Sequence, residues 1–157
     1  MKVMLKQNKM NSNYFSVKIQ FEVVNEKGKV KKINESYITL GYTFSDAEAS
    51  IADNLKDDIQ VDYIVSSMKR EKISEIFKSD AEKFFKYKVA FISLDEEKGT
   101  EKKESYNMLV QADDLDSSKK LFIENMKSTL NDYVVEKIEE TKIKKVFAID
   151  TNSDYIN

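Results

Sequence analysis

The sequence predicts an α+β protein made of two copies of a β-β-α-β unit, with antiparallel sheet and two main helices around a pseudo-twofold axis. The first observation is an ungapped match between residues 62–77 and 132–147. The second is a match at the same offset between residues 14–21 and 84–91. Two matches at one offset are hard to obtain by chance, so we interpret them as a tandem duplication.

The predicted repeats span residues 14–78 and 84–148, with terminal extensions at 1–13 and 149–157. A three-stranded sheet with one helix has an apolar face that it buries poorly alone, so we expect the two repeats to share one core. The sequence leaves open whether the strands join into one sheet or form two facing sheets.

The first repeat opens with a predicted β-hairpin. Apolar residues alternate strictly with polar ones from Phe15 to Val23, which is typical of a half-buried strand. Residues 25–28 supply the turn, with Gly28 free to take a positive φ. A second strand follows over residues 29–44, polar in its first half and apolar at alternate positions after that.

A helix and a further strand complete the first repeat. The tetrapeptide Ser45-Asp-Ala-Glu48 is a capping box and predicts a helix over about 46–57. Asp57 and Asp58 would oppose the helix dipole, so we place them just past its end. Residues 62–77 are β-rich, and we expect them to leave the sheet at 69–72 and rejoin it at 73–77. The predicted buried face of the helix carries Ala47, Ile51, Ala52 and Leu55.

The second repeat is expected to follow the same order. Residues 79–82 repeat the Ser-Asp-Ala-Glu tetrapeptide and predict a short helical turn. A strand over 85–91, a turn at 95–99 and a return strand over 105–112 follow. Asp114 or Asp116 then caps a second helix. Its apolar residues are Leu121, Phe122, Ile123, Met126 and Leu130.

Composition excludes several classes of protein. No apolar run approaches the roughly 20 residues of a membrane-spanning helix, and the apolar run after Met1 is too short for a secretory signal, so we expect a cytoplasmic protein. The chain has no Cys and no His, which removes disulfides, thiolate metal sites and nucleophiles activated by His. The net charge of −2 argues against a basic field over the whole surface, although a local basic patch remains possible.

A catalytic function has little support in the sequence. The three glycines are isolated, and neither a P-loop, a dinucleotide-binding fingerprint nor a nucleophile elbow is present. The pairs Asp57-Asp58 and Asp113-Asp114 could hold Mg²⁺ in a carboxylate-dependent nuclease. Adjacent aspartates near helix ends are more often solvated caps. We therefore expect a non-enzymatic protein without a cofactor.

Lysines on the predicted polar face of the strands favour a binding function. Lysines interleaved with tyrosines could track a single nucleic-acid strand, with lysines on phosphates and tyrosines on bases. The alternative is an ordinary solvated face with aromatic rings packed on lysine stems. Tyr37 and Tyr106 end matching Glu-Ser-Tyr triplets. The predicted nucleic-acid contacts are Lys18, Lys31, Lys32, Tyr37, Lys86, Lys88, Lys102, Lys103 and Tyr106.

The duplication itself offers a different kind of site. Two similar units form a groove at their junction, where small ligands and partner proteins often bind. Polar sheet edges would also permit assembly into a homo-oligomer. A host protein or a small nucleotide in the groove between the repeats is therefore the alternative to single-stranded nucleic acid.

Four stretches resemble a known family: residues 14–18, 93–96, 108–112 and 132–135. Together they resemble the domain-of-unknown-function family 4494, whose members occur in Bacteroidota and in the crAss-like phages that infect them. The resemblance covers about residues 14–148 and includes no catalytic signature, so it implies no activity. It does imply a phage or mobile-element origin. The leading hypothesis is thus a non-enzymatic protein that handles single-stranded nucleic acid in replication; the alternative is an anti-defence protein.

Overall fold

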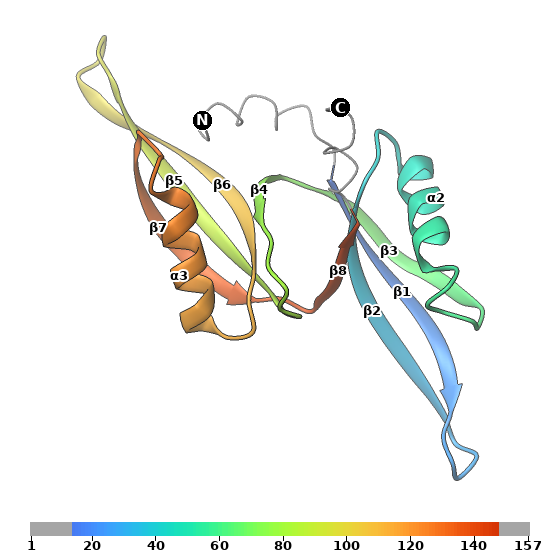
Figure 1. Ribbon diagram of the computed structural model, residues 1–157. Helices are drawn as coiled ribbons and strands as arrows, with labels where there is room; N and C mark the ends of the chain where they lie inside the picture. Colours follow the sequence, from blue (N-terminus) through green and yellow to red (C-terminus); the bar gives the residue numbers. More distant parts are fainter. Residues whose placement is uncertain (1–13, 148–157) are drawn as a thin grey trace, which may run out of the picture. The chain divides into compact units, whose positions relative to one another are not determined.

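The computed structural model describes residues 14–147, which fall into two units (Figure 1). We call residues 72–141 the continuous unit, and residues 14–71 together with 142–147 the split unit. Each unit contains one four-stranded mixed sheet and one α-helix, which confirms the α+β class and the two helices. Neither helix in the described part of the chain is long and apolar enough to cross a membrane.

The split unit is a sheet of order β3-β1-β2-β8 with one helix. Its elements are β1 (Tyr14–Val24), β2 (Val30–Leu40), α2 (Phe44–Leu55), β3 (Tyr63–Glu71) and β8 (Ile143–Phe147). Strand β1 pairs antiparallel with β2 and β3, whereas β8 pairs parallel with β2. A parallel partner needs a long crossover, and here α2, β3 and the whole continuous unit lie between β2 and β8 in the chain.

The continuous unit has the same arrangement, with the order β4-β6-β5-β7. Its elements are β4 (Ile73–Phe77), β5 (Phe84–Asp95), β6 (Thr100–Gln111), α3 (Leu115–Met126) and β7 (Asp132–Glu140). Strand β5 pairs antiparallel with β6 and β7, and β4 pairs parallel with β6. The registers also correspond, because Phe147 lies beside Thr39 in one sheet as Phe77 lies beside Val110 in the other.

The two units exchange their parallel edge strands. Only Lys72 separates β3 from β4, yet β3 belongs to the split sheet and β4 to the continuous sheet. Only Thr141 and Lys142 separate β7 from β8, which belongs to the split sheet. The expectation that residues 73–77 rejoin the sheet of residues 62–68 is therefore wrong. Because of this exchange, the boundaries of the two units, at residues 71/72 and 141/142, differ from those of the predicted repeats, 14–78 and 84–148.

Buried apolar residues group by unit, between one face of each sheet and its helix. The cluster of the split unit is Phe15, Val17, Ile19, Tyr37, Ala47, Ile51 and Leu55. The cluster of the continuous unit is Phe77, Phe85, Tyr87, Val89, Phe91, Met108, Val110, Ala112, Phe122 and Met126. Each sheet therefore covers one apolar face with its own helix. The single core shared by the two repeats stays a prediction.

Helix α2 begins two residues earlier than predicted. Strand β2 stops at Leu40, and Gly41 allows a tight turn in which an added Cβ would lie 2.9 Å from the backbone N of Ala47. The capping box is formed by Thr43, whose Oγ1 accepts from the N–H of Asp46 at 3.1 Å, and by Asp46, whose carboxylate accepts from the N–H of Thr43 at 3.2 Å. The predicted cap at Ser45 is therefore wrong.

The cap leads to a paired test. We expect Thr43→Ala to lower the free energy of unfolding by about 1 kcal/mol, because it leaves an N–H of the first turn without its acceptor. The matched control Ser45→Ala, which lies inside the first turn, should change it by less than about 0.5 kcal/mol. Urea unfolding of the two variants measures both values, and a larger loss for Ser45→Ala would contradict the assignment of the cap.

The sole arginine fastens the start of α2 to the sheet. The Arg70 guanidinium lies 4.8 Å from the ring centre of Phe15 and 5.5 Å from that of Phe44, and it donates to the carbonyl of Tyr42 at 3.0 Å. Aromatic faces attract cations, and a flat guanidinium packs on an aromatic ring better than an ammonium does. Arg70 therefore has a structural role in the split unit.

Several other expectations are corrected or confirmed. Residues 79–82 form no helical turn, because Ser79 donates from Oγ to the carbonyl of Gln111 at 2.7 Å and the segment is held along the end of β6. Strand β6 begins at Thr100 rather than at 105, and Leu130 lies beyond α3 and is exposed. Ala52 and Ile123 face solvent as well. Asp114 is confirmed as the cap of α3, and Asp57 and Asp58 follow the end of α2.

Candidate functional site

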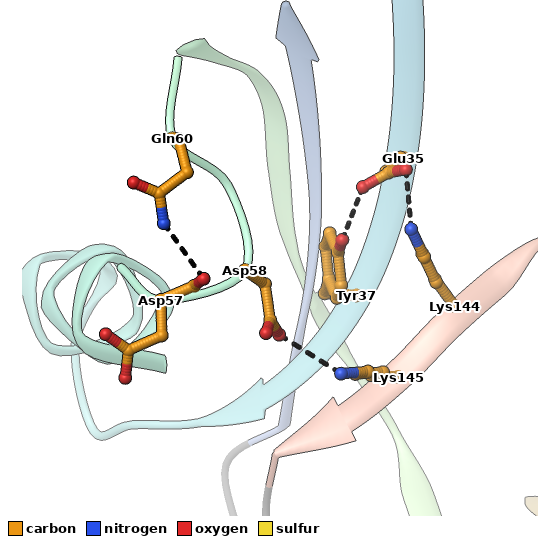
Figure 2. Close-up of polar contacts among 7 residues, drawn as sticks. All are labelled: Glu35, Tyr37, Asp57, Asp58, Gln60, Lys144 and Lys145. Atoms are coloured by element: carbon orange, nitrogen blue, oxygen red, sulfur yellow. Dashed lines mark hydrogen bonds and ion pairs between the residues drawn. The ribbon is translucent and has the colours of Figure 1, made fainter. Parts of the chain in front are cut away.

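The split unit contains a pocket of about 330 Å³ beside strand β8. The loop that follows α2 forms one side, and β1, β2 and β8 form the rest. Its apolar lining is Phe21, Val23, Ile59 and Val61. Its polar lining is Glu35, Tyr37, Asp58, Gln60, Lys144 and Lys145, all of which Figure 2 shows as sticks. The pocket thus has an apolar part and a part with charges of both signs.

Two consecutive lysines reach this pocket because β8 is bulged. Ile143 pairs with Ser36 and Lys145 pairs with Tyr37, so Lys144 is an extra residue between two paired ones. Neighbouring side chains of a regular strand point to opposite faces, whereas a bulge changes the direction of the extra side chain. Lys144 and Lys145 therefore both line the pocket.

Each lysine forms an ion pair with a carboxylate from the first part of the chain (Figure 2). Lys144 Nζ lies 2.8 Å from Glu35 Oε2, and Lys145 Nζ lies 3.1 Å from Asp58 Oδ2. The second oxygen of Glu35 accepts a hydrogen bond from the Tyr37 hydroxyl at 2.5 Å. Both lysine side chains remain about half exposed, at 53% and 51%, so a ligand in solution can reach them.

The loop after α2 holds Asp58 in place. The backbone N–H of Asp58 and that of Ile59 both donate to the carbonyl of Leu55, at 3.0 and 2.9 Å. The side-chain amide of Gln60 donates to the carbonyl of Asp57 at 3.0 Å. Orphan carbonyls of the last helical turn are satisfied in this way, and the loop has a defined shape.

The environment shifts the pKa of two groups in opposite directions. Burial raises the pKa of Glu35, but the hydrogen bonds from Lys144 and Tyr37 and the charges of Lys144 and Lys145 lower it more, so the pKa lies below its ordinary value of 4.5. Burial and the neighbouring Glu35 carboxylate raise the pKa of Tyr37. At neutral pH, Glu35 is therefore ionised and the Tyr37 hydroxyl is a hydrogen-bond donor.

The depressed pKa gives a pH-dependent stability. A carboxyl with a lower pKa in the folded state stabilises the fold above its unfolded pKa, and this contribution is lost as the pH falls through the folded pKa. We expect Glu35→Gln to lower the free energy of unfolding at pH 7 by about 1 kcal/mol, because the ion pair is only partly buried. Below the folded pKa of Glu35, the difference from the unmodified protein should shrink.

Urea unfolding across the acidic range measures this difference. The control is Glu136→Gln, since the Glu136 carboxylate lies 4.0 Å from Lys88 Nζ at the exposed surface of the continuous unit. It should cost less than about 0.5 kcal/mol. A loss for Glu35→Gln that stays constant down to the lowest pH would contradict the ionised role of Glu35.

The two lysines of the pocket have more hydrogen-bond donors than their ion pairs use. An ammonium has three N–H donors, and the two ion pairs account for one donor of each lysine. Both oxygens of Glu35 already accept a hydrogen bond. The surplus of donors suits an oxyanion, such as a phosphate or a carboxylate, while the apolar lining suits a ring or an aliphatic body.

The comparison with known proteins gives the family. A family model described as a domain of unknown function, DUF4494, matches residues 13–149. The chain belongs to DUF4494. This confirms the resemblance seen in the sequence. No curated protein matches the chain.

The corresponding place in the continuous unit of this DUF4494 protein has different residues. Val17 pairs with Tyr37, and Tyr87, seventy positions after Val17, pairs with Met108. Met108 therefore takes the place of Tyr37, and Tyr106 does not match Tyr37 as the Glu-Ser-Tyr triplets suggested. The bulge recurs in β4, where Ser74 and Glu75 take the places of Lys144 and Lys145. In the continuous unit, Ile73 pairs with Asn107 and Glu75 pairs with Met108. These pairs correspond to Ile143 with Ser36 and Lys145 with Tyr37 in the split unit.

The lysines predicted for nucleic-acid binding by the DUF4494 chain lie in both units. Lys18, Lys31 and Lys32 are exposed in the split unit, and Lys88, Lys102 and Lys103 are exposed in the continuous unit. Lys86 is partly buried. Lys88 Nζ lies 4.0 Å from the carboxylate of Glu136. No single sheet face therefore brings the whole set together.

The two predicted tyrosines are less accessible than expected. Tyr37 is 2% exposed, and its ring is stacked on Phe147 with centres 5.5 Å apart. A ring covered in this way is not available to stack on a base. Tyr106 is partly buried and meets Phe91 edge-on at 5.6 Å. Tyr37 instead contributes its hydroxyl to the pocket.

The paired aspartates belong to different units. Asp57 and Asp58 lie in the split unit, whereas Asp113 and Asp114 lie in the continuous unit. Asp113 accepts from the backbone N–H of Glu82, and Asp114 from that of Ser117. Within residues 14–147, no group of three or more Asp, Glu, Cys or His side chains is placed to hold a metal ion.

Sequence reasoning missed Glu35, Lys144 and Lys145 as members of one site. The lysines were assigned to a strand of the second repeat, whereas they lie beside a strand of the first. One signal was present: Lys144-Lys145 stands opposite Ser74-Glu75 when residues 132–147 are aligned with residues 62–77, so the charge at this position differs between the two matching segments.

Proposed function

We propose that this DUF4494 protein is a non-enzymatic binding protein and that the pocket beside β8 takes a small anionic molecule with a planar or apolar body, such as a nucleotide. The observation that carries the proposal is the bulge that brings Lys144 and Lys145 to the wall of a pocket whose other side has the apolar residues Phe21, Val23, Ile59 and Val61. In terms of the sequence repeats, the pocket lies between them, because β2 belongs to the first repeat and β8 to the second.

Charge and size both support an anionic ligand. An oxyanion placed between the two ammonium groups would accept from both, and such charge-assisted hydrogen bonds are the strong ones. The ion pairs to Glu35 and Asp58 keep the lysines positioned without ligand. A volume of about 330 Å³ is at the lower end of the range for ligand pockets. The ligand would lay its ring or chain on Phe21, Ile59 and Val61.

Calorimetric titration tests the proposal with stated probes: inorganic phosphate and the monophosphates of adenosine, guanosine, cytidine and uridine. We expect a nucleoside monophosphate to bind more tightly than phosphate, because only the former reaches the apolar lining. The variant Lys144→Gln/Lys145→Gln should lose at least about tenfold in affinity, equivalent to about 1.4 kcal/mol.

The control variant is Lys119→Gln/Lys120→Gln, which removes the same charge from two exposed lysines of α3 in the other unit. It should bind as the unmodified protein does. An equal loss in the two variants would show a nonspecific effect of net charge. Absence of binding for all five probes at about 1 mM would contradict the proposal.

The duplication remains part of the proposal. The same strand order, the same sense of each pairing and the corresponding registers in the two sheets support a tandem duplication of about seventy residues, with the pseudo-twofold axis expected from it. On this interpretation, the lysine pair of β8 is a later specialisation of one copy.

Single-stranded nucleic acid, handled in phage or mobile-element replication, stays a prediction. Its support is the set of exposed lysines on the strands, and the covered ring of Tyr37 counts against stacking. Binding of oligo-dT at low and at high salt tests it, because phosphate contacts weaken steeply with salt. An anti-defence protein that binds a host protein would leave both the oligonucleotide and the nucleotide titrations without signal.

A further inference from the structure

The two β-hairpins of the chain carry opposite charge. We call residues 21–33, at the turn of β1 and β2, the basic arm, and residues 91–104, at the turn of β5 and β6, the acidic arm. The registers of the two sheets make these segments equivalent. In Figure 1 each hairpin extends past the helix of its own unit. The arms therefore differ in charge while they match in structure.

The charges follow directly from the residues of each arm. The basic arm has four lysines and two glutamates, which give +2; they are Lys27, Lys29, Lys31, Lys32, Glu22 and Glu26. The acidic arm has five acids and three lysines, which give −2; they are Asp95, Glu96, Glu97, Glu101, Glu104, Lys98, Lys102 and Lys103. Complementary potentials of this kind speed association and fix its orientation.

Both arms also expose apolar side chains. Val24 and Val30 face each other across the basic hairpin and are 66% and 59% exposed. Leu94 on the acidic hairpin is 64% exposed. Burial of apolar area is the main favourable term in most protein association, and a charged rim around it is the usual composition of an interface.

The lysines of the basic arm, Lys27, Lys29, Lys31 and Lys32, form no ion pair with an acid of their own chain among residues 14–147. Glu22 is the nearest acid by register, opposite Lys32. The ammonium groups at the turn are therefore available to a partner.

We propose that the basic arm of one copy docks on the acidic arm of a second copy. A single contact of this kind is heterologous, because the two surfaces that meet are different, so a docked pair of copies still presents one free basic arm and one free acidic arm. Heterologous contacts propagate into a ring if the rotation closes and into a filament if it does not. This association involves neither Lys144 nor Lys145, so it stands independently of the pocket.

A second copy fits the arms better than a nucleic-acid strand does. Phosphates would match the basic arm but would be repelled by the acidic arm, whereas a copy of the chain uses both. The exposed apolar side chains of the basic arm are valines rather than aromatic rings, whereas proteins that bind single-stranded nucleic acid stack its bases on aromatic rings.

Sedimentation velocity of the full chain tests the proposal through charge reversal. The variant Lys29→Glu/Lys31→Glu changes the basic arm from +2 to −2, and Glu97→Lys/Glu101→Lys changes the acidic arm from −2 to +2. The unmodified protein should show an average mass that rises with protein concentration at low salt and falls at about 0.5 M salt, where charges are screened within a few ångströms.

Each variant alone should stay monomeric, because both of its arms then have the same sign. An equimolar mixture of the two variants should associate again, since one has two acidic arms and the other two basic arms. The substitutions lie in exposed turn and strand positions, and circular dichroism checks that the fold is kept.

Three results would overturn the proposal. The first is an unmodified protein that stays monomeric at about 0.2 mM in low salt. The second is association that neither charge reversal weakens. The third is a monomeric protein that binds oligo-dT through Lys29 and Lys31, which would support the nucleic-acid prediction instead.

Discussion

Oxidation of the double variant Phe77→Cys/Val110→Cys should produce an intramolecular disulfide in nearly every chain. Phe77 on β4 lies beside Val110 on β6, and neighbouring strands are about 4.8 Å apart, which is within the Cα separation that a disulfide spans. The natural chain has no cysteine, so every thiol in the variant is an introduced one. Thiol titration and electrophoresis without reductant measure the result.

The matched control is Phe77→Cys/Thr39→Cys, which shares one substitution with the test variant. Thr39 holds in the split sheet the place that Val110 holds in the continuous sheet. If β4 remained with the sheet of β3, as the sequence led us to expect, Phe77 would lie beside Thr39 and this pair would oxidise. An internal disulfide in the control but not in the test variant would therefore disprove the strand exchange. A covalent dimer would show that strands exchange between chains.

Local patterns identified most elements correctly. Strand β1 is half-buried, and its alternation follows directly: Phe15, Val17 and Ile19 are fully buried while Lys18 is exposed. The same holds for β5, where Lys88 is exposed between Tyr87 and Val89. A strand with one covered face has apolar residues at every second position, so these assignments needed no information about distant parts of the chain.

The destination of a short strand is not a local property. Residues 73–77 and 143–147 have similar sequences, and either could bury its aromatic residue on either sheet. Which sheet each strand joins depends on contacts with residues far away in the chain and on the one or two residues that link it to the preceding strand. The sequence match showed that the two segments correspond, but not that they change places.

The alternation of apolar and polar residues in β2 predicted the wrong environment for the Tyr37 side chain. The apolar Ile38 and Leu40 suggested that Tyr37 lies on the polar face of β2. In the structure Tyr37, Ile38 and Thr39 are all buried, so both faces are covered along this part of the strand. Thr39 is tolerated because its Oγ1 is 2.5 Å from Ser50 Oγ. Where both faces of a strand are covered, alternation no longer tells which side chain points to the helix.

The pocket could not be derived from spacing for a related reason. It depends on a bulge in β8, on the parallel pairing of β8 with β2, and on the loop after α2. Lys144 and Lys145 are consecutive, and a regular strand would send them to opposite faces. The sequence alone therefore argued against the shared wall that the structure shows.

The substitution Phe122→Ala should give the largest loss of stability among single changes in α3, about 3–5 kcal/mol. The Phe122 ring is 3% exposed and stacks on Tyr87 with ring centres 4.5 Å apart. It also meets Tyr133 edge-on at 5.9 Å and Phe77 at 6.2 Å. Through Phe77, this ring covers the exchanged strand β4. Truncation to a methyl group leaves a cavity and removes three aromatic contacts at once, and better helix propensity of alanine offsets only a small part.

The neighbouring residue supplies the control. Ile123 is 57% exposed on the same helix, so Ile123→Ala should change the free energy of unfolding by less than about 0.5 kcal/mol. Urea unfolding followed by far-ultraviolet circular dichroism and by tyrosine fluorescence measures both variants, since the chain has no tryptophan. Because each unit has its own buried cluster, loss of the Phe122 ring acts first on the continuous unit. A loss below about 1 kcal/mol for Phe122→Ala would mean that α3 does not cover this sheet as described.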